Sequence, residues 1–179
     1  MIKITNVAIY LDMDGVLTDF CKSAYAVYPR FDLMHGLYSD EIKCQEKRDI
    51  RKDFSKTIRE TPNFWLNMDW LSAGISLVNH VTNNYSHVGI ITAPMSEDPD
   101  CERQKRLWVN QHLGFFIKQE HMFVGDDKYK YMNSLPGKHQ ILIDDRKKNI
   151  DLWNANGGIG ILHSCESLDQ TLSILTKYI

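Results

Sequence analysis

Two aspartates separated by one residue stand out in this sequence, because they follow an apolar run and precede a glycine. The run Val7–Leu11 is typical of a buried strand, and Asp12 and Asp14 come directly after it. Residues i and i+2 of a strand share a face, so a turn at Gly15 can bring the two carboxylates together. Neighbouring carboxylates repel each other unless a cation lies between them. We therefore interpret this stretch as a magnesium-binding active site.

Further polar residues end other apolar runs of the chain. Thr92 closes the run Val88–Thr92, and the pair Asp144 and Asp145 follows the run that ends at Ile143. Open parallel sheets bind their ligands beyond the carboxyl ends of the strands. We therefore expect Thr92 and the acidic pair to lie beside Asp12.

The elements that must position these residues alternate along most of the chain. Short apolar runs predict strands at Val7–Leu11, Val88–Thr92, Met122–Val124, Gln140–Ile143 and Ile159–Leu162. Amphipathic stretches predict helices at Leu71–Tyr85, Cys101–Leu113, Arg146–Ala155 and Leu168–Tyr178. This alternation predicts an α/β fold, a Rossmann-like parallel sheet with helices on both faces.

One region interrupts the alternation. Residues 20–74 contain no good strand, but they contain helical patterns at Cys21–Tyr28 and Asp40–Arg59. Because this segment begins right after the Asp-x-Asp turn, we expect a small helical cap that covers the site. The predicted domains are an α/β core of residues 1–19 and 75–179 and a cap of residues 20–74, inserted between the first two strands.

Composition excludes several classes of protein. The 179 residues are 43% hydrophobic and 25% charged, which are globular values. The formal net charge of −2 provides no basic field for duplex nucleic acid or for an anionic membrane. No secretion signal or membrane-length apolar run is found, and the four cysteines form no CxxC pair. We therefore expect a cytoplasmic protein with reduced thiols.

The motifs resemble those of the haloacid dehalogenase-like (HAD) phosphohydrolases. The Asp-x-Asp motif of that family is matched by Asp12–Val16, its Ser/Thr motif by Thr92, and its acidic pair by Asp144 and Asp145. The stretch from Asp12 to Phe20, the Thr-Ala-Pro turn and the cap segment Pro62–Trp65 are similar to the 5′(3′)-deoxyribonucleotidase branch. The resemblance extends from Val7 to about Leu162 and implies a HAD-like core.

This resemblance implies a phosphomonoesterase that uses Mg²⁺ and forms an aspartyl-phosphate. Asp12 would attack phosphorus, and Asp14 would serve as general acid and base. Thr92 Oγ and the amide of Ala93 would hold phosphate oxygens. The metal would be bound by the carboxylates of Asp12 and Asp144 and by the backbone carbonyl of Asp14, with Asp145 as a ligand through water or as an orienting partner.

Two assignments within these motifs leave alternatives. The motif lysine is Lys128 or Lys130, both of which follow the third predicted strand, and we favour Lys128 as the catalytic residue. Lys130 is then a candidate for substrate binding. A second acidic pair, Asp126-Asp127, also follows a predicted strand, but the chain beyond Asp145 supplies the helix and strand that complete the sheet.

Substrate choice is expected to depend on the cap. Phe20, Phe64 and Trp65 are predicted to form an aromatic slot on which a base stacks, with packing of the cap as the alternative. One of the cations Arg103, Lys105 and Arg106, which follow the Thr-Ala-Pro turn, could support the phosphate.

The preferred hypothesis is a 5′-nucleotidase that acts on (deoxy)nucleoside monophosphates, with a small phosphate monoester as its partner and a homodimer left open. One alternative is a HAD phosphatase of a sugar phosphate or a nucleic-acid end. The other is a non-catalytic binding protein with the same fold, which the intact Asp12, Asp14, Thr92 and Asp144 disfavour.

Overall fold

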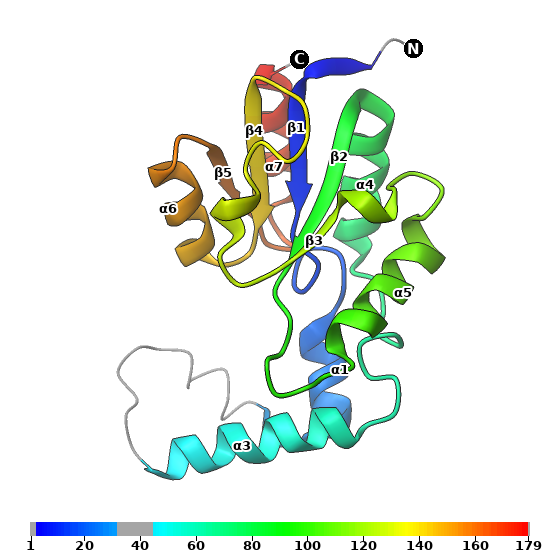
Figure 1. The fold of residues 1–179 in the computed structure, drawn as a ribbon, viewed down its shortest axis with the longest axis vertical. Coiled ribbons are helices and arrows are strands. Elements are labelled where there is room, and N and C mark those ends of the chain that lie inside the picture. Colours follow the sequence, from blue (N-terminus) through cyan, green and yellow to red (C-terminus); the bar gives the residue numbers. More distant parts are fainter. Residues whose placement is uncertain (1–2, 32–44, 179) are drawn as a thin grey trace.

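The computed structural model describes residues 3–31 and 45–178. Its centre is a five-stranded parallel sheet in the order β3-β2-β1-β4-β5 (Figure 1). The strands are β1 (Ile4–Leu11), β2 (Tyr85–Thr92), β3 (Met122–Val124), β4 (His139–Asp144) and β5 (Ile159–Leu162). All five predicted strands are present, although β1 and β2 each begin earlier than expected and β4 is one residue longer at each end. The predicted parallel α/β fold is confirmed.

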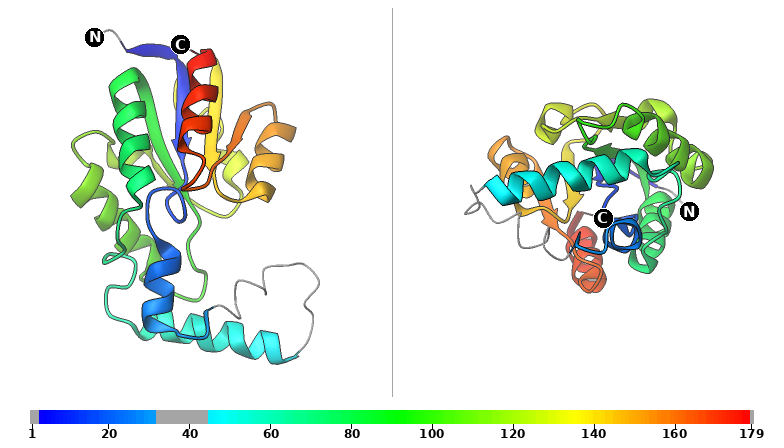
Figure 2. Two further views of the ribbon diagram at one scale, coloured as in Figure 1. Left: turned by 180° about the vertical axis from the view of Figure 1, so that it is seen from behind. Right: turned by 90° about the horizontal axis from the view of Figure 1, so that it is seen from below.

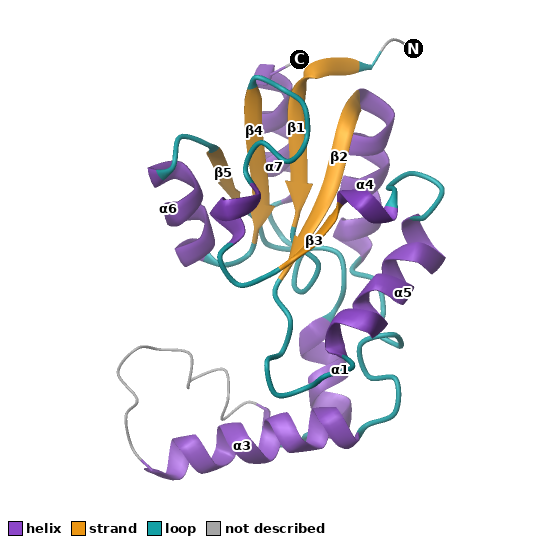
Figure 3. Cartoon of the chain, viewed as in Figure 1, coloured by secondary structure: helices purple, strands orange, loops and turns teal. Residues whose placement is uncertain are grey.

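The helices that follow the strands are also close to their predicted positions (Figure 3). Their bounds are α4 (Ser72–Asn84), α5 (Cys101–Leu113), α6 (Lys147–Ala155) and α7 (Leu168–Leu175). Helix α6 begins one residue later than predicted because the backbone of Arg146 is extended. Helix α7 ends before the predicted Tyr178 and continues as a 3₁₀ turn over Thr176–Tyr178.

The core lies on both faces of the central strand β1. Val7, Ile9 and Leu11 join one hydrophobic cluster, whereas Ala8 and Tyr10 join another, and all five are fully buried. This division follows from the pleat, which sends alternate side chains to opposite faces. A parallel strand that is covered on both faces must be apolar throughout, and this is why the strands are visible in the sequence.

Helices cover each face of the sheet. Buried side chains of α4, α5 and α7 belong to the first cluster, and those of α6 belong to the second. Figure 2 shows α4 and α7 side by side in front of the sheet when the molecule is seen from behind. Within residues 3–31 and 45–178, every helix is too short or too polar to span a bilayer.

Two further helices lie beyond the carboxyl ends of the strands (Figure 1), at α1 (Phe20–Val27) and α3 (Gln45–Glu60). They pack through aromatic rings, since Phe54 of α3 lies edge-on to Phe20 of α1 at a centroid distance of 6.4 Å and also contacts Tyr28 and Phe31, which follow α1, at 5.5 and 5.4 Å. Residues 32–44 of the predicted cap, including the start of the predicted helix Asp40–Arg59, lie outside the described residues. The proposed division into core and cap stays a prediction.

Helix α5 connects the segment between α3 and α4 to the sheet. The indole Nε1 of Trp108 donates to the carbonyl of Met68 at 2.9 Å, and the side chain of Gln104 accepts from the amide of Trp65 at 3.1 Å. The segment therefore has a fixed position relative to the ends of the strands.

Candidate active site

The strand register brings the predicted residues to one edge of the sheet. Leu11, the last residue of β1, pairs with Ile90 of β2 and with Ile143 of β4. The ladder continues for one more bond, because the amide of Asp12 donates to the carbonyl of Ile143 at 2.9 Å. Asp12 thus lies beside Asp144 at the carboxyl end of β4.

The turn after Asp12 requires a glycine for two reasons. Gly15 has a φ of +78°, a conformation that L side chains rarely adopt. A Cβ atom at this position would also overlap the carboxylate of Asp145. The amide of Gly15 donates to the carbonyl of Thr18 at 2.9 Å, which closes a tight loop and returns Asp14 toward the site.

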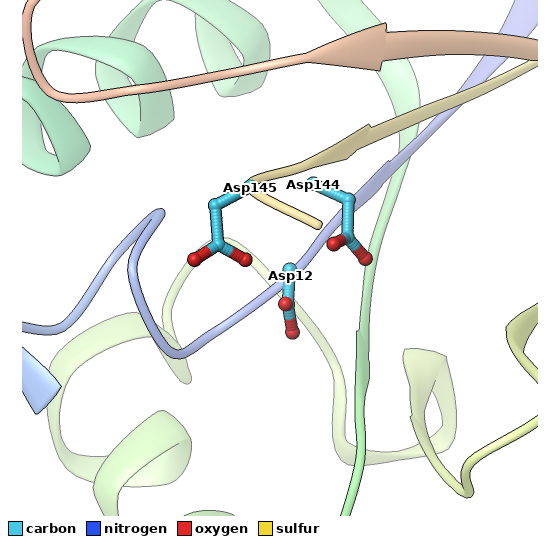
Figure 4. A group of neighbouring side chains, drawn as sticks. All are labelled: Asp12, Asp144 and Asp145. Atoms are coloured by element: carbon cyan, nitrogen blue, oxygen red, sulfur yellow. The ribbon is translucent and has the colours of Figure 1, made fainter. Parts of the chain in front are cut away.

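Three carboxylates gather where β1 and β4 end. Figure 4 shows Asp12, Asp144 and Asp145 with their carboxyl groups near one another, and each offers an oxygen within 4.8 Å of the others. Asp12 and Asp144 are buried, whereas Asp145 reaches solvent. A cluster of this kind is stable only with positive charge close by.

Lys128 supplies part of this charge from within the protein. Its ammonium group is 2.6 Å from Asp12 Oδ1 and 2.7 Å from Asp144 Oδ2, and the side chain is 3% exposed. Burial lowers the pKa of Lys128, but the carboxylates of Asp12 and Asp144 outweigh this effect and hold the pKa above its usual value. The ammonium group therefore stays charged.

Asp144 is fixed by donors from the helix that follows it. The side-chain amide of Asn149 donates to both carboxylate oxygens at 3.0 and 2.9 Å, and the backbone amide of Arg146 donates to Oδ1 at 2.8 Å. Asn149 was not among the predicted site residues. Its place in the first turn of the helix after the acidic pair was the signal, because that turn faces the ends of the strands.

Burial and crowding both affect the protonation of the cluster. Burial, together with Asp144, Asp14 and Asp145, raises the pKa of Asp12 to about 7, although Lys128 opposes this effect. Burial of the carboxyl group and the neighbouring Asp144 likewise raise the pKa of Asp145 to about 6. Burial and mutual repulsion therefore both disfavour the ionised carboxylates in the free protein, and a bound cation would offset these effects.

The donor set fits a hard divalent cation. Asp12, Asp144 and Asp145 offer carboxylate oxygens, which are the ligands that Mg²⁺ prefers, and the exposed side of Asp145 leaves room for water. Cysteine and histidine are absent from this group of described residues, which disfavours a zinc site of the usual kind.

Beside the acidic cluster, a second buried lysine contacts Asp14 and the end of β2. The ammonium group of Lys105 is 2.5 Å from Asp14 Oδ2, 3.0 Å from Thr92 Oγ1 and 2.9 Å from the carbonyl oxygen of Ala93. Of the three cations that the sequence left open after the Thr-Ala-Pro turn, the structure brings Lys105 into the site. Arg103 and Arg106 instead pair with acidic residues of their own turn.

The structure separates the alternatives for the other motifs in the same way. Lys128 lies in the site, whereas Lys130 pairs with Asp127 at 2.8 Å on the surface and is 63% exposed. Asp126 and Asp127 are exposed and lie outside the carboxylate cluster. Lys130 is therefore not brought to the position that substrate binding at this cluster would require.

The three predicted slot residues lie in one aromatic cluster. The rings of Phe20 and Trp65 are stacked at a centroid distance of 5.7 Å, and Phe64 meets both edge-on. A base between two rings needs a separation of about 7 Å, so no base fits between Phe20 and Trp65 in this conformation. Phe64 and Trp65 are 4% and 3% exposed, which leaves Phe20 as the member that offers surface to a ligand.

The raised pKa values predict a pH-dependent response to metal. Carboxyl groups whose pKa is higher in the folded than in the unfolded state bind extra protons when folded, so the metal-free protein should lose stability as the pH rises from about 4 to 7. Mg²⁺ needs ionised carboxylates, and its stabilisation should grow over the same range. We expect Mg²⁺ at about 10 mM to raise the melting temperature more at about pH 8 than at about pH 5.5.

The exposed pair provides a control for this experiment. Asp126→Asn should keep the response to Mg²⁺, and Asp145→Asn should reduce it. A larger shift at the acidic pH, or an unchanged response in Asp145→Asn, would contradict binding by the cluster.

The sequence is similar to known proteins over most of its length. Residues 5–168 match the sequence model of the family described as 5′ nucleotidase, deoxy (pyrimidine), cytosolic type C protein. The human cytosolic-type 5′(3′)-deoxyribonucleotidase is 26% identical over 155 residues, which cover 79% of this chain and 71% of the human protein. The tRNA modification GTPase MnmE of Ureaplasma parvum serovar 3 is 27% identical over 152 residues, covering 70% of this chain and 35% of that longer protein.

Solved structures show the same fold at lower sequence identity. The HAD-hydrolase YfnB from Bacillus subtilis, solved with bound magnesium, aligns with 97% of this chain and 100% of its own, with a TM-score of 0.60 and 14% identity. Since the family match spans most of its length, the chain belongs to this family of 5′ nucleotidases, which are phosphatases with a HAD-like fold.

Proposed function

We propose that this protein is a Mg²⁺-dependent phosphomonoesterase that removes phosphate from (deoxy)nucleoside 5′-monophosphates. The observation that carries the proposal is the buried Asp12 carboxylate, held 2.6 Å from Lys128 at the end of the central strand. The family match and the name of the human relative support the nucleotide as the substrate class. The cytosolic type of that relative also supports a cytoplasmic location.

Asp12 is the proposed nucleophile. Its Oδ1 atom accepts hydrogen bonds from Lys128 and from the amide of Met13 at 2.7 Å, so attack is assigned to Oδ2. The product of this attack is an aspartyl-phosphate on Asp12, which water later hydrolyses. Lys128 neutralises charge on the nucleophile and on the phosphate that approaches it.

Asp14 and Thr92 surround the position where the phosphate would lie. The partly exposed Asp14 carboxyl protonates the leaving alkoxide and then activates the water. Thr92 Oγ and the amide of Ala93 hold the phosphate oxygens. When bound by Asp12, Asp144, Asp145 and the carbonyl of Asp14, Mg²⁺ would neutralise charge on the phosphate.

The nucleoside is proposed to lie against the aromatic cluster beyond the ends of the strands. Phe20 follows the Asp-x-Asp turn directly and retains exposed surface, so its ring is the one on which a base would stack. Phe64 and Trp65 support that ring from behind through edge-on and stacked contacts.

The nucleophile assignment predicts the behaviour of one isosteric variant. Asp12→Asn should reduce Mg²⁺-dependent hydrolysis of p-nitrophenyl phosphate at least about 1,000-fold, because the amide cannot form the acyl phosphate. The matched Asp126→Asn, which removes an exposed carboxylate, should keep the activity. Steady-state rates with Mg²⁺ and with EDTA test both expectations. Turnover that survives in Asp12→Asn would refute the mechanism.

The substrate assignment predicts a preference that depends on Phe20. Nucleoside 5′-monophosphates should have higher kcat/KM values than sugar phosphates, and Phe20→Leu should raise the KM for nucleotides about fivefold or more, because it removes a stacking surface. The exposed Phe116 provides the matched control Phe116→Leu. A preference for sugar phosphates, with a nucleotide KM that Phe20→Leu leaves unchanged, would point to a different small phosphate as substrate.

A further inference from the structure

Lys105 is the buried cation that the proposed mechanism does not yet use. Its side chain is 1% exposed, and its ammonium group contacts Asp14, Thr92 and the carbonyl of Ala93. Burial of a charge at this depth is costly unless the charge is paired and hydrogen-bonded. The only carboxylate recorded in an ion pair with Lys105, among the described residues, is that of Asp14.

Both oxygens of Asp14 have partners, and Lys105 is the stronger one. Oδ2 accepts from Lys105 at 2.5 Å, whereas Oδ1 accepts from the hydroxyl of Thr18 at 3.4 Å. A charge-assisted bond is about twice as strong as a neutral one, so Lys105 dominates the orientation of the carboxyl group. Without Lys105, the Asp14 side chain, which is 28% exposed, would be free to turn toward water.

Lys105 is also contacted by a residue of the segment between α3 and α4. The ring of Trp65 lies 4.6 Å from the Lys105 ammonium, a cation–π contact in a dry environment. Trp65 is anchored in turn, because its indole donates to Asp98 at 2.8 Å and its amide donates to Gln104, the neighbour of Lys105 in α5. Trp65 therefore limits where the ammonium group can move.

We propose that Lys105 is a positioning residue that orients the Asp14 carboxyl for proton transfer, and that Trp65 holds Lys105 in the orientation required. This inference rests on the proposed function, since it assigns to Asp14 the role of proton donor. It goes further in linking that donor, through one buried lysine, to an aromatic residue outside the α/β sheet. Lys105 acts here through Asp14 rather than on the phosphate.

Substrates with different leaving groups distinguish a role in proton transfer from a role in folding or in phosphate binding. An alkoxide, as released from a nucleoside monophosphate, needs a proton in the transition state, whereas p-nitrophenolate leaves as a stable anion and needs little help. The value of kcat/KM reports only on steps up to the first irreversible one, here the transfer of phosphate to Asp12. A defect in orienting Asp14 must therefore reduce kcat/KM for the nucleotide far more than for p-nitrophenyl phosphate.

The first test compares two variants of α5 on these two substrates. Lys105→Met should lower kcat/KM for a deoxynucleoside 5′-monophosphate about 100-fold or more and that for p-nitrophenyl phosphate less than about tenfold, mainly through kcat. Arg103→Met, which removes an exposed cation of the same helix, should change neither value. Equal losses on both substrates, or a loss confined to KM, would overturn the proposal, because they indicate misfolding or a direct role in phosphate binding through Thr92.

The second test asks whether Lys105 acts through Asp14. In the Asp14→Asn background, Lys105→Met should cause little further loss on the nucleotide, since residues that act as a unit are not additive. Lys105→Arg keeps the charge and should restore part of the activity that Lys105→Met loses. Thermal melting of Lys105→Met checks that this variant is folded. A full additional loss in the double variant would overturn the role assigned to Lys105.

The third test concerns Trp65. Trp65→Phe keeps a ring over the ammonium and should preserve the ratio of the two kcat values, whereas Trp65→Leu should lower kcat for the nucleotide more than kcat for p-nitrophenyl phosphate, as Lys105→Met does. Weaker support of the Phe20 ring would instead raise the nucleotide KM. An unchanged ratio of the kcat values in Trp65→Leu, or a change confined to the nucleotide KM, would remove Trp65 from the proposal. If the unmodified protein hydrolyses neither substrate with Mg²⁺, the proposed function fails before any of these comparisons, so the two failures remain distinguishable.

Discussion

The repulsion among carboxylates at the ends of β1 and β4 is the constraint on which the rest of the site depends. Asp12 and Asp144 are buried side by side, with Asp145 next to them, and such a group is tolerable only when positive charge is close. Lys128 contacts both Asp12 and Asp144, so its positive charge reduces the repulsion between the two carboxylates. Burial, together with the neighbouring carboxylates, nevertheless keeps the pKa of Asp12 and Asp145 raised, and this is the physical reason for proposing a cation at the cluster.

The two lysines divide the acidic residues between them. Lys128 comes from the turn after β3 and serves Asp12 and Asp144, whereas Lys105 comes from α5 and serves Asp14. Each lysine is buried and held on more than one side, so the two aspartates of a single Asp-x-Asp motif have different electrostatic surroundings. This difference provides a physical basis for giving one the role of nucleophile and the other that of proton carrier.

Helix α5 has a second function besides covering the sheet. Through Gln104, Lys105 and Trp108 it contacts the segment that leads from α3 to α4, and through Lys105 it contacts the end of β2 and Asp14. Helix α5 therefore contacts both the aromatic cluster that is proposed to face the nucleoside and Asp14, the residue that is proposed to move the proton. The proposed effect of Trp65 on Asp14 therefore runs through this one helix.

The sequence by itself determined the strands, most helix bounds to within one residue, and the positions of Asp12, Asp14, Thr92 and the acidic pair, because buried parallel strands are continuous apolar runs and their polar ends are visible. It could not decide among neighbouring lysines and arginines, nor find Asn149. Residues one or two positions apart on a turn or helix differ in direction by large angles, so only the packed structure decides that Lys105 and Lys128 point inward while Arg103 and Lys130 pair at the surface. The contact between Phe20 and Trp65 was likewise decided by tertiary packing, since rings close in space need no regular spacing in the chain.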